Sequence, residues 1–146
     1  NRGKGSEGWL PLWAKLATQE QADRVVENMM DEEKFNLVVP LGVTSKDNDM
    51  FMPAKYWRGP VWMDQAMFGA EAMQNYGYHE EAQEMVLKMF VNAEGLLSDG
   101  PIRENYNPLT GEGLHTKNFS WSAASFYLLY QNVLTGNETT SQTGLE

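Results

Sequence analysis

Two helical segments joined by one tight turn constrain the fold most strongly. From Trp62 to Tyr76, apolar residues recur at helical spacing, and Gly77 follows as a residue suited to end the helix. The segment from His79 to Ala93 repeats the pattern, with glutamates on its other face. Such a pair predicts an antiparallel αα-hairpin.

A second helical pair is predicted closer to the N-terminus. The stretch 9–17 places four apolar residues on one helical stripe, namely Trp9, Leu12, Trp13 and Leu16, and Pro11 is tolerated in a first turn. Thr18 and Gln21 then have the spacing of a capping box at the start of the next helix.

The remaining elements are one short extended piece and one helix. We expect an extended piece from Phe35 to Val43, within an otherwise irregular segment. A last helix from Ser120 to Leu134 is apolar on most sides, and we expect neighbours to cover it. The chain is therefore predicted to be all-α, built of αα-hairpins with long loops before the helix starts.

Charge and composition exclude several classes of function. With 11 Lys and Arg against 20 Asp and Glu, the net charge is −9, so we expect binding neither to nucleic acid nor to an anionic membrane surface. No apolar run reaches the roughly 20 residues of a membrane span. No cysteine is present, and His115 has no second histidine at helical spacing, so we expect no metal and no cofactor.

Two loops hold the candidate functional residues. The stretch from Asp99 to Trp121 runs for roughly 20 residues without helical periodicity, which is long for a connection and typical of functional loops. It predicts an ordered active-site loop with Glu104 as an acid or a base, although a loop glutamate beside an arginine is more often a surface ion pair. The loop 53–62 is rich in aromatic residues, which suit either a core or a cleft in which rings stack on sugars.

These loops carry a resemblance to a known family. The motifs YWRGPVW (Tyr56 to Trp62), DGPIRENYNPLTGEG (Asp99 to Gly113) and NFSWSAA (Asn118 to Ala124) resemble the C-terminal part of the (α/α)6-barrel catalytic domain of glycoside hydrolase family 63, and NRGKGSEGW (Asn1 to Trp9) resembles a loop of its bacterial members. The resemblance implies about half of an (α/α)6 toroid with its long loops at the cleft end. It also implies an α-glucoside or oligosaccharide as substrate.

The resemblance further implies an inverting mechanism with Glu104 as the general base. In that mechanism a carboxylic acid protonates the leaving oxygen while a carboxylate on the other face activates water. The family's acid lies in a segment upstream of anything that corresponds to Asn1, so we expect it to be missing from this chain. We accordingly expect the fragment alone to be inactive.

Six further residues are predicted to bind substrate: Glu7, Trp57, Arg58, Asn105, Tyr106 and Trp121. Trp57 is assigned to stacking on the sugar and Arg58 to contacts with hydroxyl or carboxylate groups. Alternatively, Arg58 pairs with Glu7 or Asp64 as a buried brace, and Tyr106 and Trp121 belong to the core.

The expected organisation is a partial barrel over residues 1–136 and a polar tail over 137–146. A half-barrel exposes apolar surface, so the partner is either the remainder of the barrel or a second copy in a homodimer. The alternative function is a truncated, inactive module that binds carbohydrate or associates with itself. The location is expected to be the bacterial periplasm or cytoplasm, and the sequence does not decide between them.

Overall fold

A computed structural model describes residues 3–136, so the predicted tail 137–146 lies outside the described residues. The helical elements in chain order are η1 (Ser6–Trp9), α1 (Leu10–Trp13), α2 (Gln19–Met30), α3 (Met63–Asn75), α4 (His79–Asn92), α5 (Ser120–Leu129) and the π-helical turn η2 (Tyr130–Leu134). The strands β1 (Arg103–Tyr106) and β2 (Gly113–Lys117) pair antiparallel. None of the helices in this range is long and apolar enough to cross a membrane.

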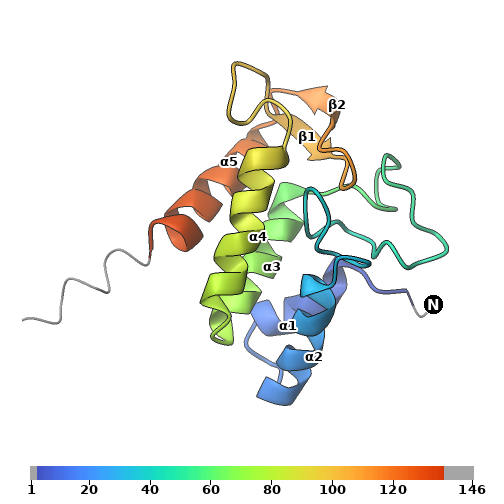
Figure 1. The fold of residues 1–146 in the computed structure, drawn as a ribbon. Helices are drawn as coiled ribbons and strands as arrows, with labels where there is room; N and C mark the ends of the chain where they lie inside the picture. Colours follow the sequence, from blue (N-terminus) through green and yellow to red (C-terminus); the bar gives the residue numbers. More distant parts are fainter. Residues whose placement is uncertain (1–2, 137–146) are drawn as a thin grey trace, which may run out of the picture.

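The predicted hairpin of α3 and α4 is confirmed and occupies the middle of the molecule (Figure 1). Gly77 has φ 89°, a backbone conformation that favours glycine and reverses the chain after α3. Helix α5 packs against α3, and η2 packs against α4. The hairpin β1–β2 and the irregular segment between α2 and α3 extend from this helical layer (Figure 1).

The N-terminal pair is confirmed in outline and corrected in detail. The capping box is present, because the Thr18 side chain accepts from the Gln21 backbone and the Gln21 side chain accepts from the Thr18 backbone. The predicted apolar stripe is only half buried: Trp9 and Leu12 enter the core, whereas Trp13 and Leu16 are exposed. The reason is that α1 ends at Trp13, after which the chain turns away at Lys15 with φ 57°.

The core joins the helices through close contacts around Gly69. A Cβ atom at this position of α3 would lie 3.1 to 3.3 Å from side-chain atoms of Leu41, Met29 and Trp9, so glycine is what lets η1 and α2 approach. The Trp9 ring meets Phe35 edge to face at 5.3 Å. Completely buried apolar side chains of this kind each contribute roughly 1.5–3 kcal/mol. Methionines supply much of the filling on α2, α3 and α4, namely Met29, Met63, Met73, Met85 and Met89.

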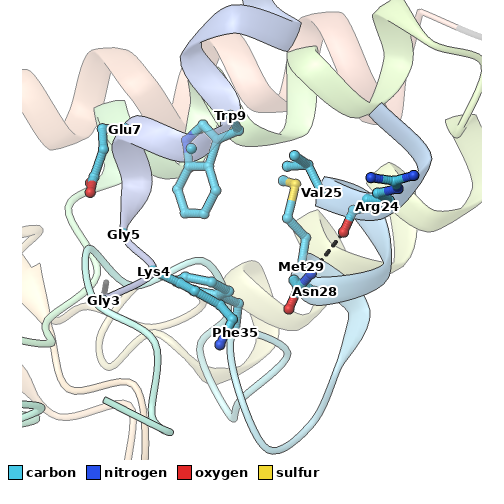
Figure 2. Close-up of a pocket in the computed structure, with 11 residues that line it drawn as sticks. Gly3, Lys4, Gly5, Glu7, Trp9, Arg24, Val25, Asn28, Met29 and Phe35 are labelled. Atoms are coloured by element: carbon cyan, nitrogen blue, oxygen red, sulfur yellow. Dashed lines mark hydrogen bonds between the residues drawn. The ribbon is translucent and has the colours of Figure 1, made fainter. Parts of the chain in front are cut away.

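A cavity of about 280 Å³ remains beside this core, between η1 and α2 (Figure 2). Its wall is mostly apolar, with Trp9, Met29 and Phe35 inside and Lys4 and Arg24 at the rim. It lies beside the N-terminal helices and is lined by no residue of the β1–β2 hairpin.

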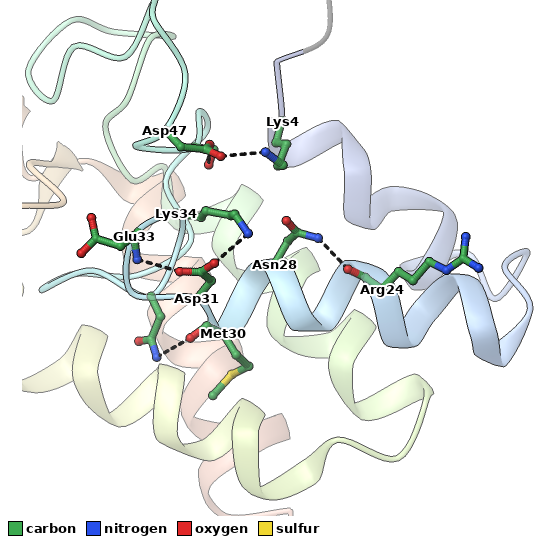
Figure 3. Close-up of polar contacts among 10 residues, drawn as sticks. Lys4, Arg24, Asn28, Met30, Asp31, Glu33, Lys34 and Asp47 are labelled. Carbon is green, nitrogen blue, oxygen red and sulfur yellow. Dashed lines mark hydrogen bonds and ion pairs between the residues drawn. The ribbon is translucent and has the colours of Figure 1, made fainter.

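The segment between α2 and α3 is irregular but well held, as Figure 3 shows for its first part. At the end of α2, Asp31 accepts from the Glu33 backbone at 2.8 Å and pairs with Lys34 at 2.7 Å. Lys4 Nζ lies 2.8 Å from Asp47 Oδ2 and attaches the N-terminus to this segment.

The extended piece expected over Phe35–Val43 forms no strand. Within the described residues, the ladder contact of this region is an isolated bridge between Gly5 and Thr44, just beyond the expected piece. Instead the chain loops back on itself, with the Leu41 N–H donating to the Phe35 carbonyl at 2.9 Å and φ 63° at Leu41. Val39 donates to the Pro108 carbonyl at 3.1 Å, so this segment is braced against the loop that carries the candidate site.

Two other expectations need correction. The sequence predicts a loop over 99–121 in an all-α chain, but this stretch contains the β1–β2 hairpin. Helix α5 was expected to be covered on most sides, yet Trp121, Tyr127 and Leu128 are exposed in the described part of the chain. Part of the apolar surface of α5 is therefore not covered by residues 3–136.

Candidate active site

Glu104 lies on β1 opposite an irregularity in the hairpin. Arg103 pairs with Lys117 and Asn105 with Leu114, so one residue of β1 faces the two residues His115 and Thr116 of β2. This two-against-one count defines a β-bulge, a feature that redirects side chains and occurs often beside active sites. His115 adopts φ 59° here. The bulge brings the Thr116 backbone N–H to the Glu104 carboxylate.

Both oxygens of the Glu104 carboxylate are held. The Tyr56 hydroxyl donates to Oε1 at 2.9 Å, and the Thr116 backbone N–H donates to Oε2 at 3.3 Å. The Ser122 hydroxyl donates to the Glu104 backbone carbonyl at 3.0 Å and ties β1 to the first turn of α5. Glu104 is only 9% exposed. Its position is thus fixed from three separate parts of the chain.

This environment keeps the carboxylate ionised. Burial on its own would raise the pKa of Glu104, but the hydrogen bonds from Tyr56 and Thr116, aided by the nearby His115, outweigh burial and leave the pKa below its ordinary value. The same bond to Glu104 raises the pKa of Tyr56, which therefore stays a donor. An ionised carboxylate suits a general base, whereas a general acid needs a raised pKa.

Aromatic rings surround the Tyr56 side chain that holds Glu104. Tyr56 meets Trp62 edge to face at 4.8 Å and His115 at 5.2 Å. Trp57 stacks on Trp62 with centroids 4.3 Å apart and an interplanar angle of 2°. Trp121 reaches the same group, 5.9 Å from Trp62. We call Tyr56, Trp57, Trp62 and Trp121 the aromatic wall.

Two predicted substrate-binding residues present exposed rings in this wall. Trp57 is 51% exposed and Trp121 is 48% exposed. Each therefore offers free ring surface near Glu104, as stacking on a sugar requires. Trp62, at 2% exposure, supports the other rings from behind and donates through Nε1 to the Tyr56 carbonyl at 2.9 Å.

Arg58 lies in the same loop, where it contacts Met50, and its predicted contact with the substrate stays a prediction. Its Nε donates to the Met50 carbonyl at 2.9 Å, and Nη2 lies 3.7 Å from the Met50 sulfur. It forms none of the ion pairs found among residues 3–136, so the alternative of a buried brace with Glu7 or Asp64 is wrong. Arg58 instead closes the loop 50–58 on itself.

Tyr106 and Asn105 are buried rather than on the wall. Tyr106 is completely enclosed in the core, where its hydroxyl accepts from the Arg103 backbone at 2.9 Å, and burial raises its pKa. Asn105 is also fully enclosed, and its Oδ1 lies 2.8 Å from His115 Nδ1. The burial of Tyr106 agrees with the alternative that it belongs to the core, and the predicted part of both residues in substrate binding stays a prediction. Both residues position the strand that carries Glu104.

Glu7 is exposed on η1, on the other side of the ribbon from Trp9 (Figure 2). Its carboxylate folds back over Gly5, where a Cβ atom would meet Oε2 at 2.3 Å. Its predicted part in substrate binding stays a prediction. No group of three or more His, Cys, Asp or Glu side chains able to hold a metal ion occurs among the described residues.

Sequence reasoning missed three contributors to the site: Tyr56, Thr116 and Ser122. Tyr56 lies 48 positions before Glu104, and no local pattern announces that contact. The hairpin itself had a signal, because Asn107, Pro108 and Gly111 form a turn cluster between two short segments. In the structure Gly111 donates to the Asn107 carbonyl at 2.8 Å and closes this turn.

Comparison with known proteins gives the class. The description "Mannosylglycerate hydrolase MGH1-like glycoside hydrolase domain" belongs to a family model that matches residues 1–122. The mannosylglycerate hydrolase of Thermus thermophilus is 34% identical over 122 residues, covering 83% of this chain and 28% of that enzyme. The glucosylglycerate hydrolase of Mycolicibacterium hassiacum is 35% identical over 94 residues, covering 63% of this chain and 19% of that enzyme.

The fold comparison agrees. The crystal structure of GH63 mannosylglycerate hydrolase from Thermus thermophilus in complex with Tris and D-glycerate superposes with a TM-score of 0.75 and 31% identity, over 89% of this chain and 30% of that one. The fold and the family motifs define part of a glycoside hydrolase domain, and its structural neighbours are (α/α)6-barrel enzymes. The chain belongs to glycoside hydrolase family 63. The family model that it matches is that of the MGH1-like mannosylglycerate hydrolases. The match spans 28% and 19% of the length of these two curated relatives.

Proposed function

We propose that this chain supplies the general base and part of the sugar-binding wall of an inverting glycoside hydrolase that acts on glycosides of glycerate. The observation that carries the proposal is the Glu104 carboxylate, held by Tyr56 and Thr116 beside the exposed rings of Trp57 and Trp121. A lowered pKa, fixed geometry and adjacent stacking surface are the features that water activation beside a bound sugar needs.

The substrate class follows the relatives and widens the sequence-based expectation of an α-glucoside. The similar proteins are hydrolases of mannosylglycerate and of glucosylglycerate. Both substrates pair a pyranose with a small carboxylate, and the aromatic wall offers ring surface suited to the pyranose. We therefore propose an α-linked mannosyl or glucosyl group as the part that this chain contacts.

The general acid is proposed to lie outside this chain. Inversion uses two carboxyl groups roughly 6.5–9.5 Å apart, one on each face of the sugar. The chain covers 28% of the Thermus enzyme, so most of that enzyme's length has no counterpart here. Without the acid, the leaving oxygen is not protonated, and the reaction loses a rate enhancement of about 10²–10⁴-fold.

The domain assignment follows from the same reasoning. Residues 1–136 are proposed to form about half of the (α/α)6 toroid, with the exposed side chains of α5 facing the remaining helices. Exposed rings and aliphatic side chains on and just after these two helices, α1 and α5, support this, namely Leu10, Trp13, Leu16, Tyr127, Leu128 and Tyr130. A second copy of the chain is the other possible cover for this surface.

A second candidate function is a carbohydrate-binding half-barrel without turnover. The observation in its favour is the exposed ring surface of Trp57 and Trp121, which can stack on a sugar without any catalytic group. In this case the chain alone would bind the glycoside with tryptophan fluorescence changes that depend on Trp57, and the protein would be a stable dimer in solution.

Product stereochemistry tests the proposed reaction. A protein that carries this chain together with the rest of the barrel should hydrolyse mannosylglycerate or glucosylglycerate. Proton NMR should show the β-anomer of the free sugar first. The isolated chain should show no hydrolysis. First release of the α-anomer would overturn the inverting mechanism, and robust hydrolysis by the isolated chain would overturn the assignment of the acid to another segment.

A further inference from the structure

The face of the β1–β2 hairpin turned away from Glu104 carries two cations side by side. Side chains alternate between the faces of a strand, so Arg103 and Glu104 leave β1 in opposite directions. Arg103 is the direct partner of Lys117 across the hairpin. Like charges in this position repel each other and weaken a hairpin unless something neutralises them.

A cavity of about 320 Å³ opens at this pair. The cations Arg103 and Lys117 line it on the side of the hairpin. The loop after α4 lines the rest, with Glu94, Gly95, Ser98, Gly100 and Pro101. The loop is drawn in tightly, because a Cβ atom at Gly100 would lie 2.6 Å from Gly95 Cα. The cavity is thus a space enclosed by two backbone segments, and both cations border it.

The Arg103 side chain is held in place but not satisfied. Its stem crosses Gly113, where a Cβ atom would meet Arg103 Cγ at 2.3 Å, and its Nη2 donates to the His115 carbonyl at 2.8 Å. Its Nε is buried and has no hydrogen-bond partner within residues 3–136. Because Nε is buried, a ligand in the cavity cannot reach it, and the part of the guanidinium that borders the cavity is the part available to a ligand.

Glu94, the carboxylate that lines the cavity, does not neutralise the pair. Glu94 Oε2 accepts from the Gly113 backbone at 2.6 Å, so it is engaged with the turn end of β2. Neither Arg103 nor Lys117 takes part in the ion pairs found in the described part of the chain. Two adjacent cations therefore face one cavity, and none of the carboxylates within residues 3–136 lies at ion-pair distance from them.

We propose that this cavity binds a small oxyanion, a carboxylate or a phosphate, between Arg103 and Lys117. A guanidinium suits such a ligand because its planar donors match two oxygens at once, and the lysine adds a point charge. The bound anion connects β1 to β2 behind the catalytic face. It relieves the repulsion between the cations and stabilises Lys117, the neighbour of Thr116, whose N–H holds Glu104. This site is separate from the proposed sugar-binding wall.

The test is anion-dependent stability of the chain. Thermal unfolding is followed with inorganic phosphate or acetate added at constant ionic strength, balanced with sodium chloride. A ligand that binds only the folded chain raises the midpoint temperature with a saturable dependence on concentration. We expect this rise with at least one of the two probes. The tighter probe identifies the ligand geometry, tetrahedral for phosphate and planar for a carboxylate.

Charge-neutral variants locate the site. Lys117→Gln should weaken the apparent affinity about tenfold, the loss of one charge-assisted hydrogen bond. Lys117 is exposed, so this variant keeps its fold, whereas Arg103→Gln also removes packing on Gly113. Lys15→Gln makes the same change of charge on α1's side of the molecule and should leave the affinity unaltered. The proposal would be overturned if the midpoint temperature rose equally in Lys117→Gln and in the native chain. It would also be overturned if chloride alone gave the same rise, or if the rise with phosphate and with acetate did not saturate.

Discussion

Replacing Tyr106 by phenylalanine tests how the Glu104 strand is held. The aromatic ring stays in the core, and the only loss is the hydroxyl that accepts from the Arg103 N–H at 2.9 Å. An N–H left without an acceptor in a partly buried strand costs about 1–3 kcal/mol. At roughly 2–4 °C per kcal/mol for a chain of this size, the midpoint of thermal unfolding should fall by about 2–12 °C.

The measurements are thermal unfolding and urea unfolding, each followed by tryptophan fluorescence, with Tyr127→Phe as the matched control. Tyr127 is 60% exposed on α5, so losing its hydroxyl should change the free energy of unfolding by no more than about 0.5 kcal/mol. If the two variants lost the same stability, or if Tyr106→Phe lost none, the hydroxyl would not be the clamp that holds β1. A weakened sugar affinity with full stability would instead return Tyr106 to the wall.

Three further changes follow from local geometry. Gly111→Ala should lower the free energy of unfolding, measured with a chemical denaturant, by about 1–3 kcal/mol or more. The reason is that φ is 79° at this position and a Cβ atom would lie 2.1 Å from the Asn92 carbonyl oxygen. Gly8→Ala is the control, because a Cβ atom there meets nothing within 4 Å, and it should be nearly neutral. Thr18→Ala should cost about 1 kcal/mol by removing the α2 capping box, and an unchanged unfolding midpoint would contradict this. The lowered pKa of Glu104 means that its ionised form adds stability above the unfolded-state pKa of about 4.3, which is lost as the pH falls through the folded-state pKa. The stability difference between the native chain and Tyr56→Phe should therefore shrink on acidification, and a constant difference across the titration would refute the hydrogen bond's role.

The helices were predictable because their signals are local. Thr18 with Gln21 defines the start of α2, and Gly77 ends α3, each through contacts within a few residues. Burial was less predictable. The stripe from Trp9 to Leu16 looks uniformly apolar, but α1 is one turn long, so only its first part reaches the core.

Part of the candidate site could be proposed from the sequence. Family motifs pointed to Glu104 as the base, which stays a prediction, and the structure gathers Trp57 and Trp121 in one group of rings with Trp62. The bulge opposite Glu104 could not be read from the sequence, because it depends on the register of two strands. The contacts that Arg58 makes with Met50 and that Tyr106 makes with Arg103 could not be predicted either, because they depend on the tertiary fold.

The central claim is that Glu104 activates water, and one substitution tests it directly. In a protein that joins this chain to the rest of the barrel, Glu104→Gln keeps the side-chain shape but removes the base. We expect hydrolysis of mannosylglycerate or glucosylglycerate to fall by about 10²–10⁴-fold. Azide needs no deprotonation, so it should restore turnover and give a glycosyl azide of inverted configuration. A Glu104→Gln rate equal to that of the native protein would contradict the account.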